Sequence, residues 1–412
     1  MNAIVICSGD ELIEGRVADT NGAFLARTLT DLGAAVLGVR MVGDDLDELV
    51  RELSDAAARA DLIAVTGGLG GTKDDITREA IAKAFGRPLE RREEAAANLV
   101  RFWKRLGREL PPEPWPEAMA PRGSIILDNA VGIAPGLVLA VDEPKTVVFA
   151  FPGVPAELER IVADGAFRGS GDPGTARADV GLVGLRESAA AALLGERLAR
   201  GRNPLIGIGA KDGTLVLHIR AKAADPAAAR AMLEVDLSAI EAAMGAHVFT
   251  TSGESIGAAV VRELSARSAT LAVAESLTGG YAAHCITETP GASKVFLGGA
   301  TVYTEAAKMS LAAVPKDLLE RFGAVSEETA IAMALGIRER LGSTYGVATT
   351  GIAGPDGGTD RSPVGTVFVA VADRDGVRAE KRLHPGSRSS IKKKAAVHAL
   401  DLLLRRLKGP RA

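Results

Sequence analysis

The apolar positions of the first 90 residues form short runs that alternate with segments of helical periodicity. Three of the runs are typical of buried strands, at 3–7, 36–42 and 62–66. The segments after them predict helices, at 21–32, 46–60 and 76–85. This alternation indicates a parallel, doubly wound α/β sheet, in which ligands bind beyond the carboxyl ends of the strands.

The pattern breaks at residues 169–174, Gly-Ser-Gly-Asp-Pro-Gly, which predict a linker. A small α+β unit follows up to residue 250, with a hairpin turn at Asp212-Gly213 and a long helix over 226–244. The run 181–184 spells G-x-x-G, the nucleotide clamp of KH domains. It falls within a predicted strand without a basic cluster, so we interpret it as chance. We expect this unit to connect the two flanking domains or to mediate dimerisation.

Residues 251–412 return to alternating strands and helices. Strands are predicted by four apolar runs, at 270–273, 295–303, 346–350 and 364–372. Helices are predicted by apolar periodicity, at 256–267, 281–286, 327–341 and after 388. This segment is therefore a second α/β domain.

Composition narrows the class of protein. Charged residues make up 25% of the 412 residues and the net charge is −3, which argues against a general nucleic-acid or membrane-surface binder. Cys7 and Cys285 are the only cysteines, which favours a reducing compartment. The five histidines show no zinc-site spacing. No apolar run approaches about 20 residues, and the first residues form a strand without a leader pattern. We expect a cytoplasmic protein.

The stretch 274–280, Ala-Glu-Ser-Leu-Thr-Gly-Gly, lies between a predicted strand and a predicted helix. Ser276 at the strand end suits a nucleophile. The glycines and the free N–H groups of the helix's first turn suit a bound anion. The alternative is a capped helix start, with Ser276 or Thr278 as the N-cap.

Three strand ends of this domain carry hydroxyl groups, glycine or a cation. They are Ser276, Tyr303 with the nearby Lys308, and Thr350 before Gly351. Because strand ends of an α/β sheet converge, these groups are expected to share one pocket. A lysine whose pKa is lowered by burial can activate a serine, and Arg388 can bind a phosphate with two N–H groups. Each of these residues also has a purely structural interpretation. Lys308 and Arg388 would be exposed surface charges, Tyr303 would pack against the sheet, and Thr350 would precede a turn.

Three further groups of this domain bear on the assignment of the nucleophile and its base. His284 lies eight residues beyond Ser276 and is an alternative base, although its apolar neighbours favour a packed residue. Residues 389–392 match S-x-x-K but begin a helix, where serine is a natural cap, so we interpret them as a decoy. Glu305 lies close to Lys308 and would raise the pKa of that lysine, which would weaken it as a base.

A glycine-rich loop at 66–75 follows a strand of the first domain. It is neither a Walker A loop nor a dinucleotide G-x-G-x-x-G motif. Phosphate contacts are expected from the loop residues Gly67, Gly68, Gly70, Thr72 and Lys73. A divalent metal such as Mg²⁺ is expected on the two adjacent carboxylates, Asp74 and Asp75. The alternative is a helix start whose carboxylates favour the positive end of the dipole.

The C-terminal motifs resemble the nicotinamide-nucleotide amidase (NMN deamidase) domain of the CinA family. The resemblance rests on motifs in a fixed order, at 274–280, 302–303, 308, 323–326, 351–357, 363–367 and 385–388. It implies a three-layer α/β/α domain that hydrolyses nicotinamide mononucleotide (NMN) to nicotinate mononucleotide and ammonia without a cofactor.

The same resemblance assigns roles to single residues. It makes Ser276 the nucleophile, Lys308 the base and Tyr303 an aid to proton transfer, while Thr350 orients the reacting groups and Arg388 supports the site. Substrate contacts are implied for residues of the glycine-containing loops, Thr278, Gly279, Gly280, Gly351, Ala353 and Gly354.

The N-terminal segments 9–11, 19–21, 42–45, 66–70 and 151–155 resemble the molybdopterin-binding, MoaB/MogA-like fold of CinA proteins. This implies ADP-ribose pyrophosphatase activity with a divalent metal, and the family also implies a KH-like middle domain and a homodimer. The expected domains are 1–168, 169–250 and 251–412. The alternative from another class is a binding adaptor in DNA uptake or recombination. It would need a basic or apolar partner face, which the composition does not show.

Overall fold

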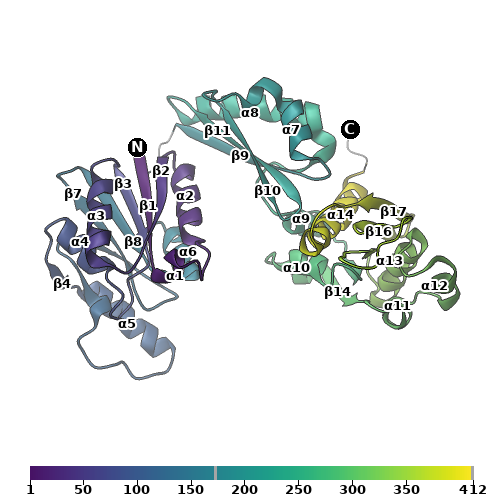
Figure 1. Ribbon diagram of the computed structural model, residues 1–412, viewed down its shortest axis with the longest axis horizontal. Helices are drawn as coiled ribbons and strands as arrows, with labels where there is room; N and C mark the ends of the chain where they lie inside the picture. Colours follow the sequence, from purple (N-terminus) through teal and green to yellow (C-terminus); the bar gives the residue numbers. More distant parts are fainter. Residues whose placement is uncertain (171–173, 410–412) are drawn as a thin grey trace. The chain divides into compact units, whose positions relative to one another are not determined.

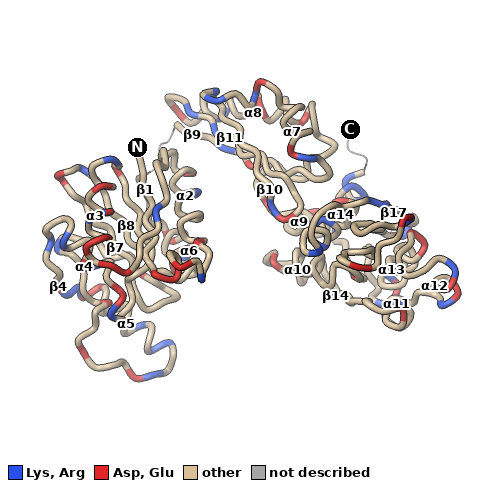
Figure 2. Tube along the Cα trace, in the orientation of Figure 1, with Lys and Arg blue, Asp and Glu red and all other residues tan. Residues whose placement is uncertain are grey.

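The computed structural model describes residues 1–170 and 174–409 (Figure 1). The chain divides into two compact units, Met1–Thr175 and Ala176–Ala412. The predicted linker lies partly outside the described residues, at 171–173. Within the described part of the chain, no helix is both long and apolar enough to cross a membrane. Residues of both charge signs are interspersed along the elements of each unit (Figure 2).

The first unit contains a six-stranded sheet in the order β2-β1-β3-β8-β7-β6. Its strands are β1 (Asn2–Ser8), β2 (Ala35–Val42), β3 (Leu62–Thr66), β6 (Ile125–Leu127), β7 (Gly136–Val141) and β8 (Thr146–Phe151). The strands β2, β1 and β3 are parallel, as predicted, and β8 is parallel to β3, whereas β7 pairs antiparallel with both of its neighbours, β8 and β6. The parallel sheet therefore carries an antiparallel edge.

Helices cover both faces of this sheet, as a doubly wound fold requires. Alternate residues of β1 divide between the faces: Ala3, Val5 and Cys7 pack toward α2 and α6, and Ile4 and Ile6 pack toward α3 and α4. These four helices are α2 (Asn21–Asp31), α3 (Leu46–Ala57), α4 (Thr77–Ala84) and α6 (Pro155–Ala163). The unit is completed by the longer helix α5 (Glu93–Arg105) and by three short elements, α1 (Asp10–Ile13), β4 (Leu89–Arg91) and β5 (Met119–Pro121).

The second unit begins with a four-stranded sheet in the order β10-β11-β9-β12, against which two helices pack. These elements are β9 (Thr175–Leu182), α7 (Glu187–Leu194), β10 (Leu205–Lys211), β11 (Thr214–Lys222), α8 (Pro226–Met244) and β12 (Val248–Thr250). The Asp212-Gly213 hairpin and the long helix are confirmed. The G-x-x-G run is not a clamp between helices, because β9 ends inside it at Leu182.

The C-terminal part has a five-stranded sheet in the order β14-β13-β15-β16-β17. Its strands are β13 (Leu271–Glu275), β14 (Phe296–Thr301), β15 (Tyr345–Gly351), β16 (Thr366–Asp373) and β17 (Gly376–Leu383). One face packs against α9 (Ile256–Ala266), α10 (Tyr281–Thr287) and α14 (Arg388–Lys408). The other packs against α11 (Glu305–Ala312), α12 (Lys316–Phe322) and α13 (Glu327–Leu341). The predicted three-layer α/β/α architecture is confirmed.

Candidate active site

The carboxyl end of β13 places Ser276 beside the lysine predicted to act as its base. Lys308 Nζ donates a hydrogen bond to Ser276 Oγ at 3.0 Å and a second to the carbonyl oxygen of Val302, also at 3.0 Å. Lys308 lies in the first turns of α11, whose N-cap Thr304 accepts a hydrogen bond from Ala307 N–H. The cap fixes where this helix begins and so directs the lysine toward the sheet.

Lys308 is only 2% exposed. Burial lowers the pKa of its ammonium group, because the charged form loses its hydration. The carboxylate of Glu305 acts in the opposite direction and raises this pKa, but its effect is the smaller of the two. The expectation that Glu305 raises the pKa is therefore right in sign, and burial outweighs it.

The predicted catalytic residues line a single cavity of 160 Å³. Its walls come from Ser276, Leu277, Tyr303, Lys308, Ala324, Val325, Thr350, Gly351, Ala353 and Arg388. Two hydrogen bonds hold Arg388 at the cavity: one guanidinium nitrogen donates to the Gly354 carbonyl at 2.6 Å and another to the Tyr303 hydroxyl at 2.8 Å. Thr350 is buried and donates to the Ala324 carbonyl at 2.7 Å, so it fixes the 324–325 wall.

The helix start after Ser276 differs from both sequence interpretations. Neither Ser276 nor Thr278 caps α10, whose N-cap is Gly280. The buried carboxylate of Glu275 instead accepts the N–H groups of Gly280 and Ala282 at 3.0 Å and of Ala283 at 2.8 Å. These donors are therefore not free to bind an anion. The sequence did contain a signal for this cap, because a carboxylate at the end of a strand and just before a helix favours the positive end of the helix dipole.

Three predicted substrate contacts do not reach the cavity. Thr278 is fully buried and its hydroxyl hydrogen-bonds to that of Thr349 at 2.7 Å. Gly279 and Gly280 have φ of 60° and 94°, which suit glycine, and they form the turn into α10 without lining the pocket. Gly351 and Ala353 do line it, and Gly354 contributes through the carbonyl that holds Arg388.

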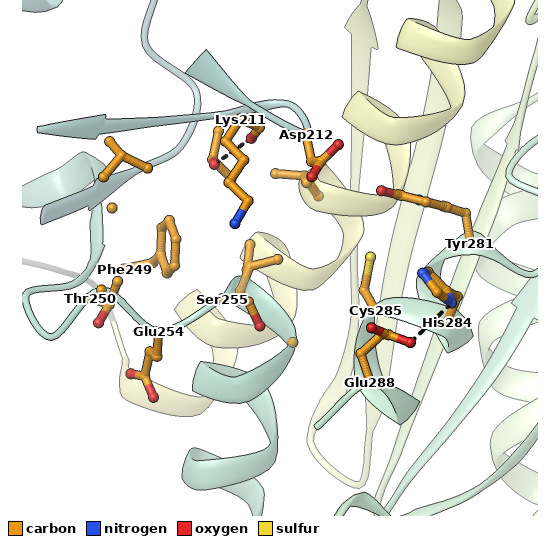
Figure 3. A pocket seen from close by; sticks show the side chains of 17 residues that line it. Lys211, Asp212, Phe249, Thr250, Glu254, Ser255, Tyr281, His284, Cys285 and Glu288 are labelled. Carbon is orange, nitrogen blue, oxygen red and sulfur yellow. Dashed lines mark hydrogen bonds and ion pairs between the residues drawn. The ribbon is translucent and has the colours of Figure 1, made fainter. Parts of the chain in front are cut away.

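A larger cavity of 410 Å³ lies between the middle domain and α9–α10 (Figure 3). Lys211 and Asp212 border it on the hairpin side, and Tyr281, His284 and Cys285 lie on the α10 side. The interpretation of His284 as a packed residue is wrong: its side chain is 56% exposed and pairs with Glu288 at 3.9 Å. Neither Ser276 nor Lys308 lines this cavity.

The N-terminal glycine loop borders a separate cavity of 330 Å³. Gly67, Gly68, Gly70, Asp74 and Asp75 are among its lining residues, whereas Thr72 and Lys73 are not. Three further carboxylates that the sequence interpretation did not include also line it, Glu11, Asp44 and Glu157.

One of the two predicted metal ligands of this loop is already engaged in hydrogen bonds. Asp75 already accepts hydrogen bonds from the N–H groups of Gly70 and Thr72, both at 2.8 Å, and from the Thr72 hydroxyl. Its carboxylate is thus used to hold the loop. Over residues 1–170 and 174–409, no three histidine, cysteine or carboxylate side chains come together as a metal site.

Comparisons with known proteins cover all three parts of the chain. A model described as "CinA C-terminal domain" matches residues 253–407, "Damage-inducible protein CinA KH domain" matches 180–250 and "Probable molybdopterin binding domain" matches 4–164. A "CinA-like protein" of Frankia casuarinae is 40% identical, with 99% of this chain and 97% of that protein aligned. A "Putative competence-damage inducible protein" of Symbiobacterium thermophilum is 39% identical, with 99% of each chain aligned.

Solved structures match part of the chain. The competence/damage inducible protein CihA of Agrobacterium tumefaciens is 35% identical with a TM-score of 0.36, covering 37% of this chain and 93% of that one. The protein CinA of Thermoplasma acidophilum is 38% identical with a TM-score of 0.36, covering 40% and 94%. On the full-length identity to its relatives and the three domain matches, the chain belongs to the CinA family.

Proposed function

We propose that the C-terminal domain hydrolyses the carboxamide of NMN to nicotinate mononucleotide and ammonia. The observation that carries the proposal is the hydrogen bond of 3.0 Å between Lys308 Nζ and Ser276 Oγ in a buried pocket. A serine needs a base to become a nucleophile, and a lysine whose pKa is lowered by burial serves as one. The choice of NMN comes from the family resemblance of the surrounding motifs.

The dyad accounts for both halves of an amide hydrolysis. Neutral Lys308 takes the proton of Ser276 Oγ as this oxygen attacks the carboxamide carbon. The C–N bond then breaks, the lysine returns the proton to the leaving ammonia, and an ester on Ser276 remains. Water, activated by the same amine, cleaves this ester and restores the serine.

The oxyanion of the intermediate needs donors near Ser276. Leu277 and Ala353 line the pocket, and neither backbone N–H has a hydrogen-bond acceptor among the residues that the structure describes. We propose that these two N–H groups donate hydrogen bonds to the oxyanion.

The predicted role of Tyr303 in proton transfer becomes a positioning role in this proposal, because the hydroxyl of Tyr303 accepts a hydrogen bond from Arg388.

The test is to incubate the purified chain with NMN in the presence of EDTA and to measure ammonia and nicotinate mononucleotide. Ser276→Ala is expected to lower kcat/KM by about 10³-fold or more, while the exposed Ser310→Ala serves as the matched control. Turnover by Ser276→Ala at the wild-type rate would overturn the nucleophile. If the folded wild-type chain makes no product, the binding-adaptor alternative moves ahead.

ADP-ribose hydrolysis in the N-terminal domain stays a prediction of the family resemblance. Five carboxylates line its cavity, and no lysine or arginine is among the lining residues, so a bare pyrophosphate would meet only like charge. No observation favours this activity as a second proposal.

A further inference from the structure

A fourth cavity, of 480 Å³, adjoins the catalytic pocket and shares Arg388 with it. It is lined by Tyr281, Arg388, Ser389, Lys392 and Lys393. Three of these five residues are cations and none is an acid, in contrast to the N-terminal cavity. Its chemistry therefore selects an anion.

Two of the three cations are already engaged. Arg388 holds the Gly354 carbonyl and the Tyr303 hydroxyl, and Lys393 forms an ion pair of 2.6 Å with Asp212. Lys392 has no hydrogen bond or ion pair with any residue in the described ranges. Its side chain is half-buried, so its ammonium group is held near the cavity and still accessible.

Lys392 also lies against the loop that carries the nucleophile. Its Nζ is 3.4 Å from the position that a Cβ atom on Gly279 would occupy. The ammonium group therefore lies within contact distance of the backbone three residues from Ser276.

The sizes of the two cavities suit a substrate whose reacting group and phosphate group lie in different cavities. Small-molecule sites span about 300 Å³ or more, so the catalytic pocket of 160 Å³ takes the group that reacts but not a whole nucleotide. The remainder must lie outside this pocket, and the cavity that shares Arg388 with it is the adjacent space. A phosphate monoester carries a charge of about −1.5 to −2 at neutral pH, which suits an unpaired ammonium group.

We propose that the 480 Å³ cavity binds the phosphate monoester of a mononucleotide substrate, with Lys392 as its cationic ligand and the Ser389 hydroxyl as a second donor. This inference rests on the proposed function, since it places the other end of the same substrate at Ser276. It makes Lys392 the residue that distinguishes a nucleotide from its nucleoside. The S-x-x-K run is then no nucleophile–base pair but contributes both donors of the phosphate subsite.

A titration tests the subsite without any turnover. Ribose 5-phosphate and ribose are titrated calorimetrically into the full chain as wild type, Lys392→Gln, Lys392→Arg and the exposed control Lys316→Gln. We expect Lys392→Gln to weaken ribose 5-phosphate binding about 10- to 100-fold, with binding retained by Lys392→Arg and Lys316→Gln. Equal affinity of wild type and Lys392→Gln, or no preference of the wild type for ribose 5-phosphate over ribose, would overturn the subsite.

Kinetics separate a binding role from a structural one. The ratio of kcat/KM for NMN to that for nicotinamide riboside is expected to fall about 10-fold or more in Lys392→Gln and to stay at the wild-type value in Lys316→Gln. If Lys392→Gln lowers both values equally, its role is structural and the proposal fails. A wild type that releases no ammonia from NMN overturns the proposed function instead, and the titration still decides the phosphate subsite.

Discussion

The burial of Lys308 lowers the pKa of its ammonium group and so allows this lysine to act as a base. A charged ammonium group with 2% exposure loses most of its hydration, and its only hydrogen-bond partners among the described residues are two neutral oxygens. Neutralisation relieves this cost, so the same burial that disfavours the charge supplies a base beside Ser276. The exposed Glu305 carboxylate opposes the effect from the first turn of α11.

The pH dependence of deamidation should follow from this balance. Deprotonated Lys308 is the active form, so kcat/KM is expected to rise with pH through a pKa below the ordinary value of 10.5. Glu305→Gln removes the group that raises this pKa, so the acidic limb of the profile should move to lower pH. The shift should shrink in high salt, because Glu305 is exposed. The measurement is kcat/KM against pH, with Glu320→Gln as the control, and a shift to higher pH would contradict the assignment.

Tyr303 can be tested as a positioning residue. Its hydroxyl accepts a hydrogen bond from Arg388, so Tyr303→Phe should lower kcat/KM about tenfold by loosening that arginine. The pH at which the acidic limb falls should not change, because Lys308 keeps its surroundings. Steady-state profiles of the two proteins decide the question: a displaced limb would show that Tyr303 takes part in proton transfer, as the sequence interpretation held.

At the scale of elements, α10 depends on one carboxylate. Glu275 is 2% exposed and accepts three N–H groups of the α10 start, so Glu275→Ala leaves these donors unsatisfied. We expect a loss of about 1–3 kcal/mol in the free energy of unfolding, and a smaller loss for Glu275→Gln. Urea unfolding measures it, with the exposed Glu288→Ala on the same helix region as control. Equal effects of Glu275→Ala and Glu288→Ala would refute this capping role.

Most elements were predictable, because their periodicity is clear. The apolar runs at 62–66 and 346–350 and the long helices 226–244 and 327–341 agree with the structure within one or two residues. Strand β17 was missed, because its sequence GVRAEKRL carries charges at half of its positions. As an edge strand it exposes alternate residues, which weakens the apolar pattern.

The candidate site was predictable to the extent that strand ends converge. That rule alone placed Ser276, Lys308 and Thr350 in one pocket, and the structure brings them together. Which partner each hydroxyl takes was not predictable, because it depends on side-chain direction across loops. Thr350 turns to the Ala324 carbonyl, and Thr278 is buried against Thr349.

At the scale of the whole molecule, the proposed chemistry belongs to one compact unit. Every residue assigned to the amidase lies in Ala176–Ala412. The middle domain contributes to the stability of this unit, because Val183 and Phe249 are buried in the same hydrophobic cluster as α9 and α14. Its hairpin also pairs Asp212 with Lys393 on α14. It is thus a packing partner of the amidase domain.

This organisation predicts the behaviour of two fragments. Residues 176–412 alone should deamidate NMN with the kcat/KM of the full chain, because all described residues that line the pocket belong to this fragment. Residues 251–412 lack Val183 and Phe249, whose burial stabilises by about 1.5–3 kcal/mol each, so this shorter fragment should unfold at a lower temperature. Ammonia release and thermal unfolding of both fragments test this. A folded but inactive 176–412 fragment would show that the amidase needs the first unit, whereas equal unfolding temperatures would show that the middle domain does not stabilise the catalytic one.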